Sequence, residues 1–433
     1  MNFPPDLFAG RRYAVVGLGR AGLPAARALV AMGADVTVWD DTASARDAAA
    51  GLVVAKPVMD GLTALVLSPG IPHQGPKAHR FALAASEAGV PILTDAELLF
   101  QAVRTAGSQA RFAGITGTNG KSTTTALLAH VLAEAGISHA AGANLGPAAL
   151  SLPLLGDDGV YVLEMSSYML ERLATLRFSA AAMLNLSADH LDRHGDMDGY
   201  AQAKRAIGDR QTAADTMVIG IDDPWSRAMA ETLAQRPARL VRISQHDRPI
   251  ATGPALPGAH NAQNIAAATA LARALGVADD AIAQAIRTYP GLPHRQELVA
   301  TVKGVAWIND SKATNADSTA WALACYEKIV WIAGGTAKDG GIESLSAYFP
   351  RVAEALLIGR DAPMLATTLA AHGVAHRDVG TLEHAVAEAA RLAPGRAEVV
   401  LLSPACASWD QFTGFDQRGD RFRALAQSLA GES

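Results

Sequence analysis

Short apolar runs alternate with stretches of helical periodicity along most of the chain. The first run, Tyr13 to Val16, ends in a glycine-rich turn, and a helix is predicted from Leu23 to Met32 before Gly33. Two further apolar runs follow, Val36 to Trp39 and Leu62 to Leu67. Strand, helix and strand in this order are typical of βαβ units around a parallel sheet. The pattern therefore predicts the α/β fold class for this segment.

The same pattern returns twice further along the chain. A strand at Phe112 to Ile115 runs into a polar loop and an amphipathic helix, and a third segment begins around His294. We expect three α/β domains, at residues 1–106, 107–293 and 294–433. The further strands predicted are Val160–Leu163, Ala182–Asn185, Val330–Ala333, Leu356–Ile358 and Val399–Leu402.

Composition narrows the class of protein. Of 433 residues, 50% are hydrophobic and 18% are charged, which excludes a disordered chain, and the net charge of −5 gives no basic footprint for nucleic acid. The two cysteines, Cys325 and Cys406, cannot form a disulfide framework and favour a reducing cytoplasm. The first twelve residues lack the apolar core of a signal peptide, and no long apolar stretch indicates membrane insertion.

The first polar motif is Gly17-Leu18-Gly19-Arg20-Ala21-Gly22, a GxGxxG turn between a strand and a helix. Such glycines allow close approach of the backbone to a phosphate at a helix N-terminus. Asp40, at the end of the next strand, is placed to accept hydrogen bonds from a ribose or a base. The alternative is that the glycines only permit close packing, and the motif does not decide between NAD and another nucleotide.

The loop from Thr116 to Ser122 is a more specific signal. Ile115 stands where the strict P-loop pattern requires glycine, but the working parts are present. Gly117 and Gly120 free the backbone to surround a phosphate, Lys121 supplies a cation, and the Ser122 hydroxyl can bind Mg²⁺. A nucleotide site is favoured over a simple turn.

Three further features lie downstream of this loop. Glu164 is the last residue of an apolar strand. At this position it could be a Mg²⁺ ligand or an exposed capping glutamate. Asp189 to Gly195 holds two acids, two histidines and an arginine, a density that favours a catalytic or metal-binding loop. Most lysines on helices are solvated, and from its frequency alone Lys204 is expected to be one of them. Asn264 could either contact an adenine or cap a helix.

The third segment carries three polar clusters after apolar runs. They span residues 309–315, 334–338 and 403–412. Polar loops at the carboxyl ends of parallel strands are where α/β domains bind ligands. Three such loops in one domain favour a binding site over ordinary turns.

Together these motifs resemble the Mur ligases. The resemblance rests on Gly114–Ser122, Asp189–Gly195, Leu256–Asn264, Asn309–Asn315 and Ser403–Phe412, in order over essentially the whole chain. It implies a Rossmann-like N-terminal domain, a P-loop-type central ATPase domain and a Rossmann-like C-terminal domain. It also implies ATP-dependent addition of D-glutamate to UDP-N-acetylmuramoyl-L-alanine through an acyl phosphate, in peptidoglycan precursor synthesis.

The resemblance assigns roles to the central domain. Lys121, His190 and Lys204 are implied to be catalytic, with Ser122 and Glu164 on one Mg²⁺ and His190 and a carbamylated Lys204 on a second. Carbamylation would turn an ammonium into a carboxylate-like ligand. The ATP-binding residues implied are Gly117, Thr118, Asn119, Gly120, Lys121, Ser122, Thr123, Asn264, Arg295 and Asp310.

The two substrates are assigned to the outer domains. The UDP-substrate residues implied are Gly17, Leu18, Gly19, Arg20, Asp40, Ser68, Gly70 and Asn144. The glutamate residues implied are Lys312, Thr314, Lys338, Ser408 and Phe415. A cytoplasmic monomer is expected.

Two departures and several rivals accompany this interpretation. Met169 stands where the family commonly has glutamine, and a methionine cannot donate the amide hydrogen bonds that glutamine would offer the substrate. The stretch of residues 242–256 is short for the central domain, which suggests that a surface hairpin is trimmed. A Mur ligase for another amino acid is the nearest rival, and a folylpolyglutamate synthase should lack residues 1–106. An NAD(P)-binding regulator or oxidoreductase would leave Lys121, His190 and Lys312 without roles.

Overall fold

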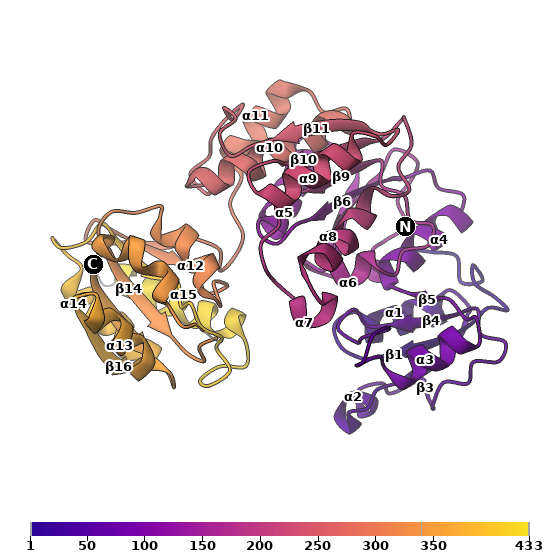
Figure 1. The fold of residues 1–433 in the computed structure, drawn as a ribbon, viewed down its shortest axis with the longest axis horizontal. Helices are drawn as coiled ribbons and strands as arrows, with labels where there is room; N and C mark the ends of the chain where they lie inside the picture. Colours follow the sequence, from indigo (N-terminus) through magenta and orange to yellow (C-terminus); the bar gives the residue numbers. More distant parts are fainter. Residues whose placement is uncertain (1, 339, 432–433) are drawn as a thin grey trace. The chain divides into compact units, whose positions relative to one another are not determined.

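The computed structural model describes residues 2–338 and 340–431, and within these ranges the chain forms three β-sheets with flanking helices (Figure 1). The predicted α/β class is confirmed. The chain divides into two compact units. The first holds the residues up to Thr252 together with Asn261–Arg287, and the second holds Gly253–His260 and the residues from Thr288 onward.

The first sheet has the strand order β3-β2-β1-β4-β5, and each pair of neighbours is parallel. The order reverses between β1 and β4, which is where open α/β sheets bind ligands. Tyr13 and Val15 of β1 pack on one face, and Ala14 and Val16 pack on the other. The elements are β1 (Arg12–Val16), α1 (Gly22–Ala31), β2 (Asp35–Trp39), α2 (Ala43–Asp47), β3 (Val53–Val54), β4 (Ala64–Leu67), α3 (Arg80–Glu87), β5 (Ile92–Leu93) and α4 (Asp95–Thr105).

The second sheet is also parallel, in the order β11-β10-β9-β6-β8-β7. The face predicted for the helix after the P-loop-like segment is buried, as Leu127, Leu128, Val131 and Leu132 are fully covered. The elements are β6 (Arg111–Thr116), α5 (Lys121–Glu134), β7 (His139–Ala143), η1 (Ala149–Ser151), β8 (Val160–Glu164), α6 (Ser167–Leu170), β9 (Ala180–Met183), α7 (Leu191–His194), α8 (Met197–Arg205), η2 (Ala206–Gly208), β10 (Thr216–Gly220), α9 (Pro224–Leu233), β11 (Arg239–Ile243), α10 (Ala259–Ala274) and α11 (Asp279–Thr288).

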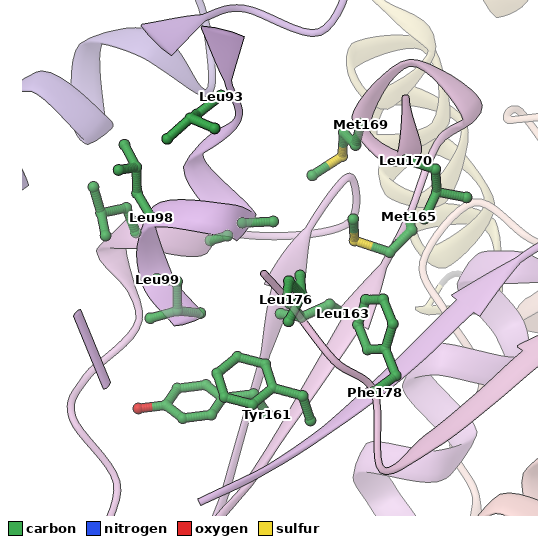
Figure 2. Packing of buried hydrophobic residues seen from close by; sticks show 14 of the residues in the cluster. Leu93, Leu98, Leu99, Tyr161, Leu163, Met165, Met169, Leu170, Leu176 and Phe178 are labelled. Carbon is green, nitrogen blue, oxygen red and sulfur yellow. The ribbon is translucent and has the colours of Figure 1, made fainter. Parts of the chain in front are cut away.

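One hydrophobic core serves both of these sheets. Helix α4 places Leu98 and Leu99 in the same cluster as Tyr161 of β8 and Phe178, which precedes β9 (Figure 2). On the same helix the buried Glu97 carboxylate accepts hydrogen bonds from the backbone N–H groups of residues 174, 175 and 176, at 2.9–3.0 Å. The first two sheets therefore form a single packed body.

The third sheet has the order β12-β13-β17-β14-β15-β16 and is parallel except for β12. Because β13, β17 and β14 are neighbours, the loops after these strands meet at one edge. The elements are β12 (Glu297–Val302), β13 (Val305–Asn309), α12 (Ala316–Leu323), β14 (Ile329–Gly334), η3 (Glu343–Arg351), β15 (Val352–Ile358), α13 (Ala362–Ala371), β16 (His376–Gly380), α14 (Leu382–Leu392), β17 (Val399–Leu402) and α15 (Phe415–Gly431).

Some predicted boundaries were wrong. The strand expected at Ala182–Asn185 is β9 at Ala180–Met183, because the carbonyl of Asn185 leaves the sheet and accepts from the N–H of Thr118. In residues 242–256, where a trimmed surface hairpin was expected, Arg242 and Ile243 end β11 (Arg239–Ile243) and the described residues after them contain no strand. Among the described helices, none combines the length and the apolar content that a membrane span requires.

Candidate functional site

A cavity of about 710 Å³ opens at the carboxyl ends of β1, β2 and β4. Backbone and side chains from both sheets of the first unit line it. The lining includes seven of the eight residues predicted for the UDP substrate: Gly17, Gly19, Arg20, Asp40, Ser68, Gly70 and Asn144. The eighth, Leu18, lies in the hydrophobic core, and its backbone N–H donates to Asp40 Oδ2 at 2.7 Å.

The three glycines of the GxGxxG turn have different roles. Gly17 has φ +87°, and a Cβ there would lie 2.7 Å from the Cβ of Ser68. A Cβ on Gly22 would lie 1.8 Å from the carbonyl oxygen of Gly17, so both positions require glycine for packing. Gly19 has nothing within 4 Å of its Cβ position, although it lines the cavity. Packing therefore does not explain Gly19, and its side facing the cavity is open.

The P-loop-like segment wraps tightly around its own lysine. Gly117 has φ +148° and Gly120 has φ +83°, and a Cβ on Gly120 would lie 2.3 Å from Asn264 Oδ1. Lys121 Nζ donates to the carbonyls of Gly117 at 3.0 Å and Thr118 at 2.7 Å. Ser122 and Thr123 lie in the first turn of α5, and the N-terminus of a helix is an electrostatically favourable position for a phosphate. Asn264 lies inside α10, which excludes its alternative role as a cap.

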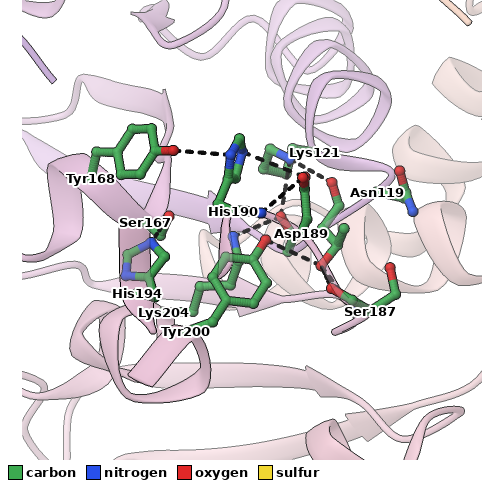
Figure 3. Close-up of polar contacts among 12 residues, drawn as sticks. Asn119, Lys121, Ser167, Tyr168, Ser187, Asp189, His190, His194, Tyr200 and Lys204 are labelled. Atoms are coloured by element: carbon green, nitrogen blue, oxygen red, sulfur yellow. Dashed lines mark hydrogen bonds and ion pairs between the residues drawn. The ribbon is translucent and has the colours of Figure 1, made fainter. Parts of the chain in front are cut away.

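Lys204 is not a solvated lysine. Its side chain is buried on α8, with a relative exposure of 1%, and its Nζ donates to Gly117 O at 2.8 Å and Thr116 Oγ1 at 3.3 Å (Figure 3). Burial, with the Lys121 cation as the next cause, lowers the pKa of Lys204 well below its ordinary value. A neutral amine is therefore more accessible here than on the surface.

His190 faces the same group of residues. Its Nδ1 lies 2.9 Å from the Tyr168 hydroxyl and its Nε2 lies 3.4 Å from Asp189 Oδ2 (Figure 3). Its backbone is left-handed, at φ +53°. Burial lowers the pKa of His190, the Asp189 carboxylate opposes this shift, and the Lys204 and Lys121 cations add to it. The net lowering favours the neutral imidazole, which is the form that binds metals.

Glu164 offers an unused ligand atom for a cation. The residue is 2% exposed, and its Oε1 accepts from Asn144 Nδ2 while its Oε2 is buried without a hydrogen-bond partner. Among the described residues, no three His, Cys, Asp or Glu side chains gather into a metal-binding set. The hard oxygens that Mg²⁺ prefers are nevertheless present in Glu164 and Ser122, and the unpaired Oε2 fits such an ion.

Asn144 connects the cavity with Glu164. Its side chain bonds Glu164 Oε1, its backbone N–H donates to Glu164 O at 3.0 Å, and the residue also lines the cavity. Met169, where the family pattern has glutamine, forms an apolar part of the same wall and is 2% exposed. The cavity wall is therefore apolar at this position, and the side chain there can donate no amide hydrogen bond.

The second unit brings together the loops predicted for glutamate. Lys312 Nζ lies 4.1 Å from the ring centroid of Phe415. Thr336 and Ala407 exchange two backbone hydrogen bonds of 2.8 Å, which joins the loop of Lys338 to that of Ser408. Lys338 is exposed, Ser408 is buried, and Lys312 and Thr314 are half-buried.

Asp310 and Arg295, predicted for ATP, lie in this second unit, whereas the P-loop residues and Asn264 lie in the first. Asp310 Oδ2 accepts from Ser403 Oγ at 2.8 Å, and Oδ1 accepts from the N–H of Gln296 at 3.2 Å. Burial raises the pKa of Asp310 to about 7.

Several residues that hold the candidate site together were not predicted from the sequence. Asn185 holds the P-loop-like segment, since its Oδ1 accepts from the N–H of Asn119 at 2.9 Å. Tyr168 and Tyr200 place their hydroxyls against His190 and Thr118. Asn185 lies two residues after the end of β9, and polar residues that directly follow an apolar strand are candidates for a site, so the sequence did mark this position. No motif or spacing in the sequence marked Tyr168 or Tyr200.

Two family models match the chain. The Mur ligase middle domain matches residues 115–253, and the Mur ligase glutamate ligase domain matches residues 294–406. The UDP-N-acetylmuramoylalanine–D-glutamate ligase of Paramagnetospirillum magneticum is 49% identical, with 98% of each chain covered. The enzyme of the same name from Nitrobacter winogradskyi is 45% identical, with 99% of this chain and 98% of that one covered.

Solved structures support the fold. The UDP-N-acetylmuramate-alanine ligase of Thermotoga maritima has a TM-score of 0.59 at 18% identity, covering 96% of this chain and 99% of its own. A pseudomurein peptide ligase type C from Methanothermus fervidus has a TM-score of 0.56 at 15% identity, covering 97% of this chain and 100% of its own.

Proposed function

The chain belongs to the Mur ligase family, and from this premise we propose that it joins D-glutamate to UDP-N-acetylmuramoyl-L-alanine in peptidoglycan precursor synthesis. The relatives named above, at 45–49% identity over nearly the full chain, carry that activity in their names. The family forms amide bonds with ATP, so the reaction passes from carboxylate to acyl phosphate to amide. A Mur ligase for another amino acid and an NAD(P)-binding protein are not favoured.

The observation that carries this proposal is the position of Asn144. Because Asn144 lines the cavity and also bonds Glu164, one end of the cavity lies against the carboxylate that we assign to a cation. A long substrate whose uridine end rests at Gly17 to Arg20 and Asp40 would bring its other end toward the P-loop-like segment. This is where the substrate carboxylate must meet the γ-phosphate of ATP.

The residues assigned to the central domain would stabilise the negative charge of the ATP phosphates. We assign Lys121, with the backbone of residues 117–120 and the first turn of α5, to the phosphates of ATP. Glu164 and Ser122 would hold one Mg²⁺, and His190 with Lys204 as a carbamate would hold a second. When bound, the ions neutralise the charge that builds on the transferring phosphoryl group. Lys121 adds a fixed cation to the same region and needs no reorganisation during the step.

The amino acid is assigned to the second unit. Lys312, Thr314, Lys338, Ser408 and Phe415 would bind D-glutamate, the lysines and hydroxyls contacting its carboxylates. Asn264, Arg295 and Asp310 are the further residues that we assign to ATP. Oriented binding of the amine lowers the entropic part of the barrier to attack on the acyl phosphate.

The remaining expectations concern organisation. We propose three functional domains, residues 1–106 for the UDP substrate, 107–293 for ATP and 294–433 for glutamate, with Rossmann-like, P-loop-type and Rossmann-like folds. A monomer in the cytoplasm would suit these soluble substrates.

The test is phosphate release from ATP with UDP-N-acetylmuramoyl-L-alanine and a panel of amino acids. D-glutamate should support turnover, and L-glutamate, L-alanine and diaminopimelate should not. Turnover with one of the other amino acids would assign the chain to a sister activity. Thermal stabilisation by NADH, without stabilisation by ATP or the UDP substrate, would favour the NAD(P)-binding alternative.

A further inference from the structure

Arg172 is a buried cation at the junction of the first two sheets. It follows α6 and is 3% exposed. Its Nη1 donates to Leu67 O at 2.9 Å and to Ser68 O at 3.1 Å, and its Nη2 donates to Pro69 O at 3.4 Å and to Ile71 O. Its Nε donates to His73 Nδ1 at 3.2 Å. One guanidinium therefore contacts the last residue of β4 and four residues of the loop after it, Ser68, Pro69, Ile71 and His73.

The acceptors explain why arginine stands here. Leu67 is the last residue of β4, and residues 68–73 after it form an irregular loop outside the sheet. Buried carbonyls of such a segment need donors from elsewhere. A guanidinium carries five N–H groups in a fixed planar fork, whereas an ammonium carries three on a flexible stem. Among the described residues, no carboxylate lies within 4.0 Å of Arg172, so its partners are the loop carbonyls and His73.

This loop forms one wall of the substrate cavity. Ser68, Pro69, Gly70 and Ile71 all line it. On its cavity side the loop also holds the glycine turn, because Ser68 Oγ donates to Gly17 O at 2.7 Å. Arg172, which is not among the residues that line the cavity, holds the loop through its carbonyls. Ser68 in turn fixes the position of the GxGxxG turn through its bond to Gly17.

The same contacts reach the loop that bears His190. Arg193 Nη2 lies 3.0 Å from His73 Nδ1, the atom that Arg172 also faces, and 3.2 Å from Glu171 Oε2. Glu171 Oε1 in turn lies 3.1 Å from His194 Nδ1. Burial, and next the Arg172 cation, lowers the pKa of His73 to about 4, so its ring is a neutral acceptor at pH 7.

We propose that Arg172 is a positioning residue for the nucleotide-sugar substrate, which sets the shape of the cavity wall at residues 68–71 and ties it to the loop of His190. The proposal rests on the proposed function, since it takes the cavity as the UDP-substrate site. Arg172 touches no substrate itself. It acts through Ser68 and the glycine turn.

The matched control is Arg210. This half-buried arginine also donates to three backbone carbonyls of the same unit, those of Leu173, Leu176 and Ala206, but it does not contact the loop after β4. Loss of either arginine removes several hydrogen bonds that are at least partly buried, so both variants should lower the melting temperature. Only loss of Arg172 should change the substrate wall.

The experiment compares Arg172→Met, Arg172→Lys and Arg210→Met in steady-state assays in which each substrate is varied in turn. Arg172→Met should raise the KM for UDP-N-acetylmuramoyl-L-alanine at least tenfold, with the KM for ATP and for D-glutamate within twofold of wild type. Arg172→Lys should recover little, because a lysine cannot span the same acceptors. Arg210→Met should leave all three KM values within twofold.

An unchanged KM for the UDP substrate in Arg172→Met, or a tenfold rise in Arg210→Met as well, would overturn the proposal. If Arg172→Met does not fold, Arg172→Lys and His73→Ala decide by the same criterion, since His73→Ala removes the shared acceptor. A wild-type enzyme without turnover on the UDP substrate would refute the proposed function instead, which keeps the two failures distinct.

Discussion

Lys121 and Lys204 donate to the same acceptor, the carbonyl oxygen of Gly117, at 3.0 and 2.8 Å. Two ammonium groups on one carbonyl repel each other, and the one on Lys204 is also buried. The arrangement therefore favours loss of the Lys204 charge. A carbamate on Lys204 would remove the repulsion and place an anion beside Lys121, where a metal and phosphates are proposed to bind.

Lys204→Ala should reduce kcat by about two orders of magnitude or more, in the range seen when a fixed electrostatic group is removed from an active site. Acetate or formate added to the buffer should restore part of the activity, because a small carboxylate can occupy the space of the carbamate. The measurement is kcat against carboxylate concentration.

Lys121→Ala serves as the control for that rescue. It should lose turnover to a similar extent, but a carboxylate should not restore it, because a cation was removed. Its melting temperature should stay close to that of wild type. Equal rescue of both variants, or an active Lys204→Ala, would remove the carbamate assignment.

Gly17→Ala and Gly19→Ala should fail in different ways. At Gly17 the backbone has φ +87° and a methyl group would overlap Ser68, so the variant should lose about 2–4 kcal/mol of stability from strain and overpacking. At Gly19 the space is open, so the melting temperature should hold while the KM for the UDP substrate rises. Thermal unfolding and substrate kinetics separate the two effects. A stable Gly17→Ala would contradict the packing argument.

Lys338→Ala and Ser408→Ala should act on the amino acid. Each removes a polar contact assigned to the glutamate carboxylates, so the KM for D-glutamate should rise about tenfold to a hundredfold, as expected for a hydrogen bond to a charged group. The KM for ATP should stay within twofold. Lys328→Ala, an exposed lysine of the same unit, should change neither constant. An effect confined to ATP would show that these loops bind something else.

Deprotonation of the buried Asp310 carboxyl should lower the free energy of unfolding of the second unit as the pH rises. Its folded pKa is about 7, above the ordinary value of 3.8, because the carboxyl is buried. The folded state therefore keeps a proton that the unfolded chain releases, so the stabilising effect is complete below pH 4 and is lost as the pH passes 7. The difference corresponds to up to about 4 kcal/mol.

The comparison is thermal unfolding of wild type and Asp310→Asn between pH 5 and pH 8. The wild type should lose stability over this range relative to the variant, whose amide does not titrate. Parallel pH profiles for the two proteins would contradict the raised pKa of Asp310.

Strand positions were largely readable from the sequence because buried parallel strands are short apolar runs bounded by polar residues. The loop of Gly117, Gly120, Lys121 and Ser122 was predictable for a related reason, because glycines and a lysine at this spacing are typical of a turn between a strand and a helix, and it does lie between β6 and α5. Its role in ATP binding stays a prediction. The α/β class followed directly from this alternation.

Burial of Lys204 could not be read in the same way. Helix α8 is polar, and the acceptors of the lysine are at Thr116 and Gly117, nearly ninety residues earlier in the chain. The role of Arg172 could not be predicted from the sequence for a different reason. Its partners are mostly backbone carbonyls, which every residue type possesses, so no sequence pattern marks them.

The bonds between Glu97 and residues 174–176 also bear on how the chain folds as it is made. The carboxylate lies on the last helix of the first sheet, yet its donors are 77–79 residues further along. At a synthesis rate of about 5–20 residues per second, helix α4 would wait roughly 4–16 s for these partners. During that interval a buried glutamate and the apolar face beside it are uncovered. The first sheet is therefore expected to reach its final form only with the second, so a nascent chain stalled near residue 110 should stay sensitive to protease and one stalled beyond residue 290 should not.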